Sequence, residues 1–141
     1  MRKIKAIIFL LGFWPLLSLA QTNIRIDNAY SREIPPSAEN IAVYMTLRNV
    51  GIHGVSLQNI SSVDAESVMI HLSVMENGMM TMQPMTELEI PPRTTARFEP
   101  GGLHIMLEGL RRQLRAGDLV RLNLEFSNGI VLRVDVPILE I

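Results

Sequence analysis

The sequence contains no cysteine. Without thiols, no disulfide holds the fold, so the hydrophobic core must stabilise it unaided. No thiolate is present to act as a nucleophile or as a metal ligand. Lysine is also absent after Lys5, and the only tryptophan is Trp14. These absences exclude disulfide-stapled scaffolds, thiol enzymes and metal sites built on cysteine.

The first twenty residues differ from the rest of the chain. Arg2, Lys3 and Lys5 precede an apolar run from Ala6 to Leu19, which ends in the small-x-small sequence Ser18-Leu19-Ala20. This layout is typical of a secretory signal peptide, and the run is shorter than the about 20 residues that a spanning helix needs. We therefore predict a signal peptide over residues 1–20 and an exported domain over residues 21–141. No membrane span is expected after cleavage, and no cysteine follows to carry a lipid.

The predicted domain has no excess of positive charge. Thirteen Lys and Arg minus the three in the signal leave ten, all arginine, against 14 Asp and Glu, a net charge near −4. Binding to nucleic acid needs a basic face, so nucleic acid is not an expected partner. The length suffices for one core, and we find neither an internal repeat nor a linker. A single domain, monomeric, is expected.

Several short segments alternate apolar and polar residues with period two. Segments 120–126 and 130–136 alternate in this way on either side of Ser127-Asn128-Gly129, which is a hairpin signal. Shorter versions of the pattern lie at 41–47, 68–74, 96–98 and 103–107. No segment of the domain shows a convincing helical period. This pattern predicts an all-β fold, a Greek-key antiparallel β-sandwich.

One predicted strand turns a histidine and a methionine to the same side. If Leu103, Ile105 and Leu107 face the core, His104 and Met106 both face outward, because successive side chains of a strand alternate. The same reasoning applied to segment 68–74, with Leu72 and Val74 facing inward, turns His71 outward. Two outward-facing strands thus carry nitrogen and sulfur donors.

A hairpin signal brings a further methionine near His71. If Asn77-Gly78 is a two-residue loop, Ser73 lies opposite Met82, which becomes the diagonal neighbour of His71 at roughly 7 Å. The same register sets polar Gln83 opposite Leu72, which is expected to face the core. A longer loop or a bulge would avoid that pairing, and the sequence leaves the choice open.

His71, Met82, His104 and Met106 together offer two imidazoles and two thioethers. Thioether sulfur is a soft neutral donor that suits copper(I) and is of little use to zinc, magnesium or calcium. Copper(II) prefers nitrogen and oxygen donors in a tetragonal arrangement, and a blue-copper centre requires the cysteine that is missing here. The four residues are therefore the predicted ligands of one copper(I) ion.

The spacing of these four residues, H-x10-M-x21-H-x-M, resembles the motif of the periplasmic PCuA(C)-type copper chaperones. The resemblance continues through Ala29-Tyr30, 44–49, 100–107 and 109–118. It implies a cupredoxin-like sandwich that carries copper(I) in the periplasm to the CuA centre of cytochrome c oxidase, with Sco-type thiol proteins as co-workers. Many relatives end in a His- and Met-rich tail, whereas this chain ends at 138–141 without one, so a second copper site there is not expected.

Other functions stay open beside delivery. A periplasmic copper buffering or resistance protein would use the same ligands without a delivery partner, and a metal-free sandwich would bind proteins through its methionine-rich face. No nucleophile and base or paired carboxylates can be assembled from the spacing, so we expect a carrier and not an enzyme. The remaining methionines are either a flexible apolar surface around the site, which we favour, or a path for copper: Met69, Met75, Met79, Met80 and Met85.

Overall fold

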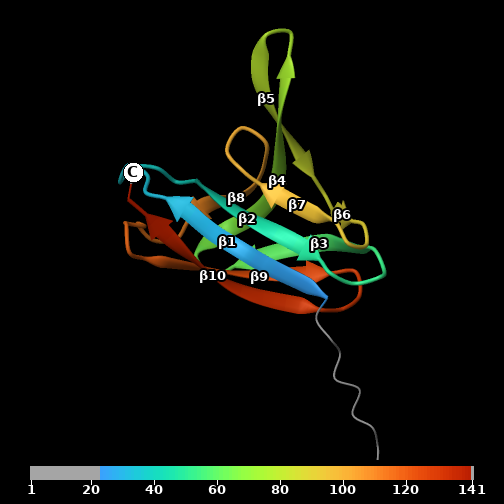
Figure 1. Ribbon diagram of the computed structural model, residues 1–141. Helices are drawn as coiled ribbons and strands as arrows, with labels where there is room; N and C mark the ends of the chain where they lie inside the picture. Colours follow the sequence, from blue (N-terminus) through green and yellow to red (C-terminus); the bar gives the residue numbers. More distant parts are fainter. Residues whose placement is uncertain (1–22, 141) are drawn as a thin grey trace, which may run out of the picture.

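Ten strands account for most of residues 23–140, the part of the chain that the computed structural model describes (Figure 1). The strands are β1 (Ile24–Arg32), β2 (Ile41–Asn49), β3 (Val55–Ser62), β4 (Ala65–Glu76), β5 (Met79–Met85), β6 (Leu88–Ile90), β7 (Thr95–Phe98), β8 (Leu103–Leu110), β9 (Leu119–Phe126) and β10 (Val131–Leu139). No helix in this part of the chain is long and apolar enough to cross a membrane. The predicted signal peptide, residues 1–20, lies outside the described residues.

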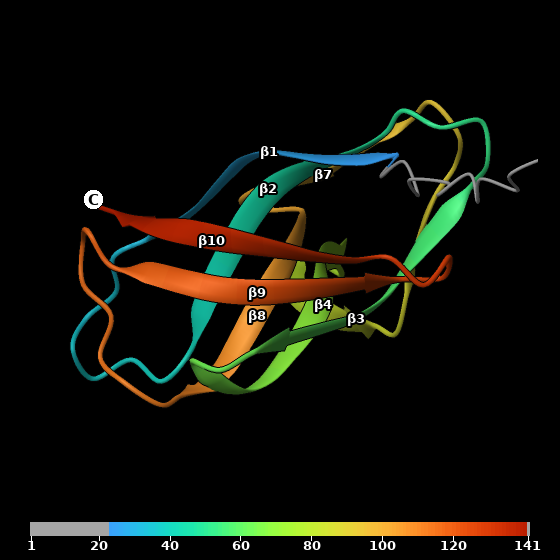
Figure 2. The ribbon, with the colours of Figure 1, turned by 90° about the horizontal axis from the view of Figure 1, so that it is seen from below.

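The strands form two layers that share one edge. One layer has the order β5-β4-β8-β2-β1, with β7 also paired to β2, and the other has the order β10-β9-β3-β6. Figure 2 shows β10, β9 and β3 lying across β2, β8 and β4. The layers join where Ser31 and Arg32 of β1 pair in parallel with Ile138 and Leu139 of β10. The predicted all-β sandwich is confirmed, and this parallel pair is the departure from a purely antiparallel arrangement.

The core lies between the layers and follows the period-two pattern. On β9, Val120, Leu122 and Leu124 are fully buried, while Arg121, between the first two, and Glu125, after Leu124, are exposed. On the opposite layer, alternate residues of β2 from Ile41 to Leu47 are buried in the same way. Each buried aliphatic side chain contributes about 1.5–3 kcal/mol relative to exposure. The alternation thus fixes which face of each strand meets the core.

The β4–β5 hairpin extends beyond the sandwich at the top of Figure 1. Its strands pair from Ile70 opposite Met85 to Glu76 opposite Met79, which leaves Asn77-Gly78 as a two-residue loop. Both loop residues have positive φ, 50° and 77°, as a type I′ hairpin turn requires. The predicted register, with Ser73 opposite Met82, is confirmed.

The burial predicted for Leu72 and Val74 is corrected by this geometry, although both lie on the same face as buried Ile70. Gln83 does lie opposite Leu72, without a longer loop or a bulge. No polar group is buried as a result, because the hairpin has left the core at this level. Leu72 and Val74 are only half-buried, and exposed Gln83 donates through Nε2 to Oε1 of Glu76 at 3.2 Å.

Candidate metal centre

The central strands β4 and β8 carry the two predicted histidine ligands side by side. In their antiparallel pairing His71 lies directly opposite His104, and Met69 lies directly opposite Met106. Because residues two apart on a strand share a face, these four side chains occupy one face of the sheet. Ile70 and Ile105, also paired, lie on the other face and are buried in the core. The packing of the core therefore sets the register that joins the two histidines.

The two imidazole rings are close and mutually perpendicular. Their centroids are 5.7 Å apart and their planes meet at 87°. His71 Nδ1 and His104 Nε2 are both buried, and neither has a hydrogen-bond partner within the described part of the chain. Buried polar atoms are nearly always hydrogen-bonded, so two unsatisfied nitrogens on paired residues are unusual. An ion between the rings would satisfy both.

A backbone carbonyl orients the His104 ring. His104 Nδ1 lies 3.1 Å from the carbonyl oxygen of Gly102, and since a carbonyl only accepts, the proton is on Nδ1. In the neutral ring this leaves a lone pair on Nε2, the nitrogen without a partner. Metal-binding histidines usually donate their other ring N–H to a carbonyl or carboxylate in this way. The ring is therefore held in the tautomer that a metal needs.

The bend before β8 supplies that carbonyl. Gly101 has a φ of +78°, which favours glycine, and the Gly102 N–H donates to the carbonyl of Glu99 at 3.1 Å. The Gly102 carbonyl also accepts from the Ser73 N–H at 3.1 Å, which ties this bend to β4. The Gly101-Gly102 bend therefore holds the start of β8 beside β4 and also orients the ring of His104.

The predicted ligands differ in exposure, and His104, which was predicted to face outward, is nevertheless buried. That side chain is on the outer face of β8 but is only 4% exposed. Strand β8 lies between β4 and β2, so neighbours flank it on both sides. His71 and Met106 are half-buried, while Met82 on the edge strand β5 is 55% exposed. Exposure thus rises from the central strand to the sheet edge.

Met82 shares the outer face but is the most distant of the four in the register. It pairs with Ser73, while His71 pairs with Pro84, so Met82 is a diagonal neighbour of His71. Methionine has three rotatable side-chain bonds and adapts to such a gap. The structure pairs His71 directly with His104 and places Met106 and Met82 on the same face, each as a diagonal neighbour of His71. Joint coordination of one ion by all four stays a prediction.

Sequence reasoning left Met69 outside the ligand set, although the alternation that turns His71 outward turns Met69 outward as well. In the structure Met69 is 38% exposed and pairs directly with Met106. Met75 and Met80 also lie on this face, opposite one another. Met85 instead packs against the core, and Met79 is on the reverse face of the hairpin. The five remaining methionines are therefore not one surface.

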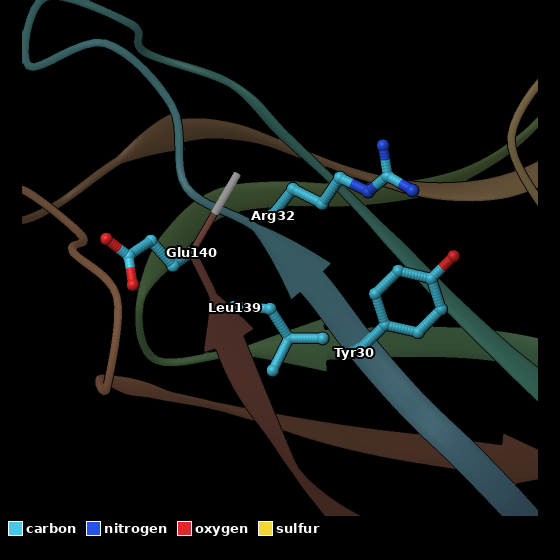
Figure 3. Close-up of a pocket in the computed structure, with 4 residues that line it drawn as sticks. All are labelled: Tyr30, Arg32, Leu139 and Glu140. Carbon is cyan, nitrogen blue, oxygen red and sulfur yellow. The ribbon is translucent and has the colours of Figure 1, made fainter.

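A hollow elsewhere on the molecule has different chemistry. It lies where β1 meets β10 and is lined by Tyr30, Arg32, Leu139 and Glu140 (Figure 3). The rings of Tyr30 and Tyr44 lie 5.3 Å apart beside it. Burial, and secondly the neighbouring Tyr30, raise the pKa of Tyr44 above its usual value. No histidine or methionine lines this hollow, so we place the candidate site on the β4–β8 face.

Several known proteins resemble this chain in sequence or in fold. The family described as "LpqE-like: Putative lipoprotein LpqE-like" matches residues 24–138. "Putative lipoprotein Lxx21020" of Leifsonia xyli subsp. xyli is 36% identical over 98 residues, 69% of this chain and 59% of that protein. The chain therefore spans about three fifths of that relative's length.

Two solved structures share the fold. The copper-bound PCuAC domain from PmoF2 superposes with a TM-score of 0.72 at 19% identity, over 85% of this chain and 95% of that domain. The solution structure of CuI-DR1885 from Deinococcus radiodurans gives a TM-score of 0.64 at 30% identity, over 86% and 81% of the two chains. The resemblance to PCuA(C)-type proteins that the motif indicated is thus confirmed. Since the family match spans nearly all the described residues, this chain belongs to the LpqE-like family.

Proposed function

We propose that this protein is a periplasmic copper(I) chaperone whose cargo ion is held by His71, Met82, His104 and Met106. The observation that carries the proposal is the pair of buried imidazole nitrogens without partners, on directly paired residues of β4 and β8. The names of two relatives support the choice of metal: the PmoF2 domain is copper-bound, and DR1885 is described with CuI.

The donor set is suited to a soft monovalent ion. Two neutral imidazoles and two thioethers carry no charge, and thioether sulfur binds copper(I) in preference to hard divalent ions. Each unsatisfied buried nitrogen costs the protein about 1–3 kcal/mol, a penalty that coordination would remove. These two nitrogens therefore lower the stability of the metal-free protein, and copper binding would remove that penalty.

The gradient of exposure supports a carrier that hands its ion on stepwise. Met82 is 55% exposed on the projecting hairpin, whereas His104 is 4% exposed on a central strand. An acceptor approaching from the hairpin side would displace the exposed thioether first and the buried imidazole last. Such an order lets the ion stay coordinated throughout the exchange, which a carrier requires and an enzyme does not.

We infer the compartment and acceptor from the sequence together with the family. The predicted signal peptide and the relatives named as lipoproteins support an exported protein. By family resemblance the acceptor is the CuA centre of cytochrome c oxidase, with Sco-type thiol proteins as co-workers. The mature domain is proposed to act as a monomer.

A competition titration with a copper(I) chelator, under anaerobic conditions, tests the site. The intact domain should hold one equivalent, and His104→Ala and Met106→Ala should lose most of the affinity. His53→Ala is the matched control, because His53 is an exposed histidine in a turn away from β4 and β8. Equal binding by the site variants and the control would reject the ligand set.

A transfer experiment separates delivery from buffering. The copper(I)-loaded domain is mixed with a soluble CuA domain and a reductant, and the copper content of each protein is measured after separation. Copper in the acceptor supports delivery. Copper that stays on this protein while the same acceptor accepts copper from a chelate supports a buffering or resistance role instead.

A further inference from the structure

A second group of sulfur donors lies on the same face, toward the tip of the β4–β5 hairpin. Met75 pairs directly with Met80, and Met82 is two residues from Met80 on the same strand and face. Directly opposed residues have Cβ atoms about 4.5–5.5 Å apart, and diagonal ones about 7–8 Å. Three flexible thioethers at such spacing are able to reach a common point.

These three methionines do not serve the core. Their exposed fractions are 64% for Met75, 53% for Met80 and 55% for Met82. The hairpin that carries them projects away from the sandwich, as Figure 1 shows. Methionine is not among the residues that favour strands, so neither packing nor strand formation accounts for three of them here.

The carboxylate nearest the tip lies on the other face of the hairpin. The carboxylate of Glu76 accepts a hydrogen bond from Gln83 on the reverse face of the hairpin, where Met79 also lies. The face with Met75, Met80 and Met82 thus presents neutral donors, three thioethers and the hydroxyl of Ser73. Such a set suits soft monovalent ions such as copper(I) or silver(I), and not calcium, magnesium or zinc.

We propose that Met75, Met80 and Met82 form a second, exposed site for a soft monovalent ion, which captures copper(I) from solution or from a donor. Met82 belongs to this site and to the predicted ligand set of His71. An ion bound at the tip then moves to the imidazoles without releasing Met82. This second step depends on the proposed function, whereas capture at the tip does not.

Silver(I) binding to a protein without the imidazole pair tests the capture site. The His71→Ala/His104→Ala variant should still bind silver(I), and adding Met75→Leu and Met80→Leu should weaken that binding about ten-fold or more. Leucine is close to methionine in size and lacks the donor. The matched control is Met79→Leu, at the same tip but on the reverse face, which should leave the affinity unchanged. Equal silver(I) affinity in the tip variant and the control would overturn the proposal.

Loading kinetics of the otherwise intact protein give a second measurement that does not require removal of buried His104. With a weak copper(I) chelate as donor, Met75→Leu/Met80→Leu should load several-fold more slowly than Met79→Leu, yet reach the same final occupancy. Equal loading rates with normal occupancy would overturn capture at the tip and leave the proposed function intact. If the Met75→Leu/Met80→Leu variant, which keeps both histidines, fails to reach full occupancy, that result would instead count against the proposed function.

Discussion

Replacing His104 with leucine should stabilise the metal-free protein while abolishing copper(I) binding at the histidine site between β4 and β8. His104 is only 4% exposed, and its Nε2 is a buried nitrogen without a partner in the described structure. Most substitutions at a buried position destabilise, by about 0.5–3 kcal/mol. Here we expect the substitution to raise the free energy of unfolding, because the His104 side chain is suited to binding a metal and is poorly satisfied in the metal-free protein.

The magnitude follows from three contributions. Removing the unsatisfied nitrogen gains about 1–3 kcal/mol, and losing the Nδ1 hydrogen bond to Gly102 gives up about 0.5–1.5 kcal/mol. The Gly102 carbonyl still accepts from the Ser73 N–H at 3.1 Å, so no new unsatisfied group appears. Leucine is close to histidine in volume, so little cavity or strain is added. The net expectation is a gain of about 1 kcal/mol for apo His104→Leu.

Urea unfolding of both proteins, with and without copper(I), is the assay. At a free copper(I) concentration about 100 times the dissociation constant of the histidine site, the wild type should gain about 2.7 kcal/mol and the variant, which lacks this site, far less. The order of stabilities should therefore reverse on adding the metal. If apo His104→Leu is less stable than the wild type by more than about 1 kcal/mol, the reasoning about the unsatisfied nitrogen is refuted.

Other predictions concern the scaffold. Asn49→Ala should lower the free energy of unfolding in urea by about 2–3 kcal/mol, because this fully buried amide donates to carbonyls at 2.8 and 3.0 Å. Gly109→Ala should cost about 1–3 kcal/mol in the same assay, since φ is +65° and the new Cβ would lie 2.9 Å from Glu66. The raised pKa of Tyr44, from burial and then Tyr30, means that folding opposes its ionisation. Stability should be complete below about pH 10 and fall as pH rises through the raised pKa, and less so in Tyr44→Phe, as urea midpoints against pH would reveal.

Local patterns predicted the hairpin and the faces of its strands. Asn77-Gly78 fixes the β4–β5 register, because a two-residue turn with positive φ permits one pairing. The alternation along β8 likewise placed His104 and Met106 on one face. These features depend on neighbours in sequence, so sequence alone suffices for them.

Features that depend on distant segments were not predicted. The direct opposition of His71 and His104 arises from pairing between β4 and β8, with three other strands between them in the chain. The burial of His104 arises from strands on both sides of β8. Neither is encoded in the spacing of a few residues.

Strands β1 and β3 were missed for a local reason. Each contains a register shift, at Asp27/Tyr30 in β1 and Leu57/Asn59 in β3, and Asn28 in the first has a φ of 53°. A bulge adds a residue and inverts the alternation after it. The period-two signal in each strand is therefore divided into pieces too short to recognise.

X-ray absorption at the copper edge, measured on the copper(I)-loaded protein, tests the central claim most directly. Coordination by His71, His104 and two methionines predicts a copper(I) edge with imidazole nitrogen and thioether sulfur together in the first shell. His104→Ala should remove part of the nitrogen contribution. A first shell of nitrogen and oxygen alone, or of sulfur alone, would contradict the account.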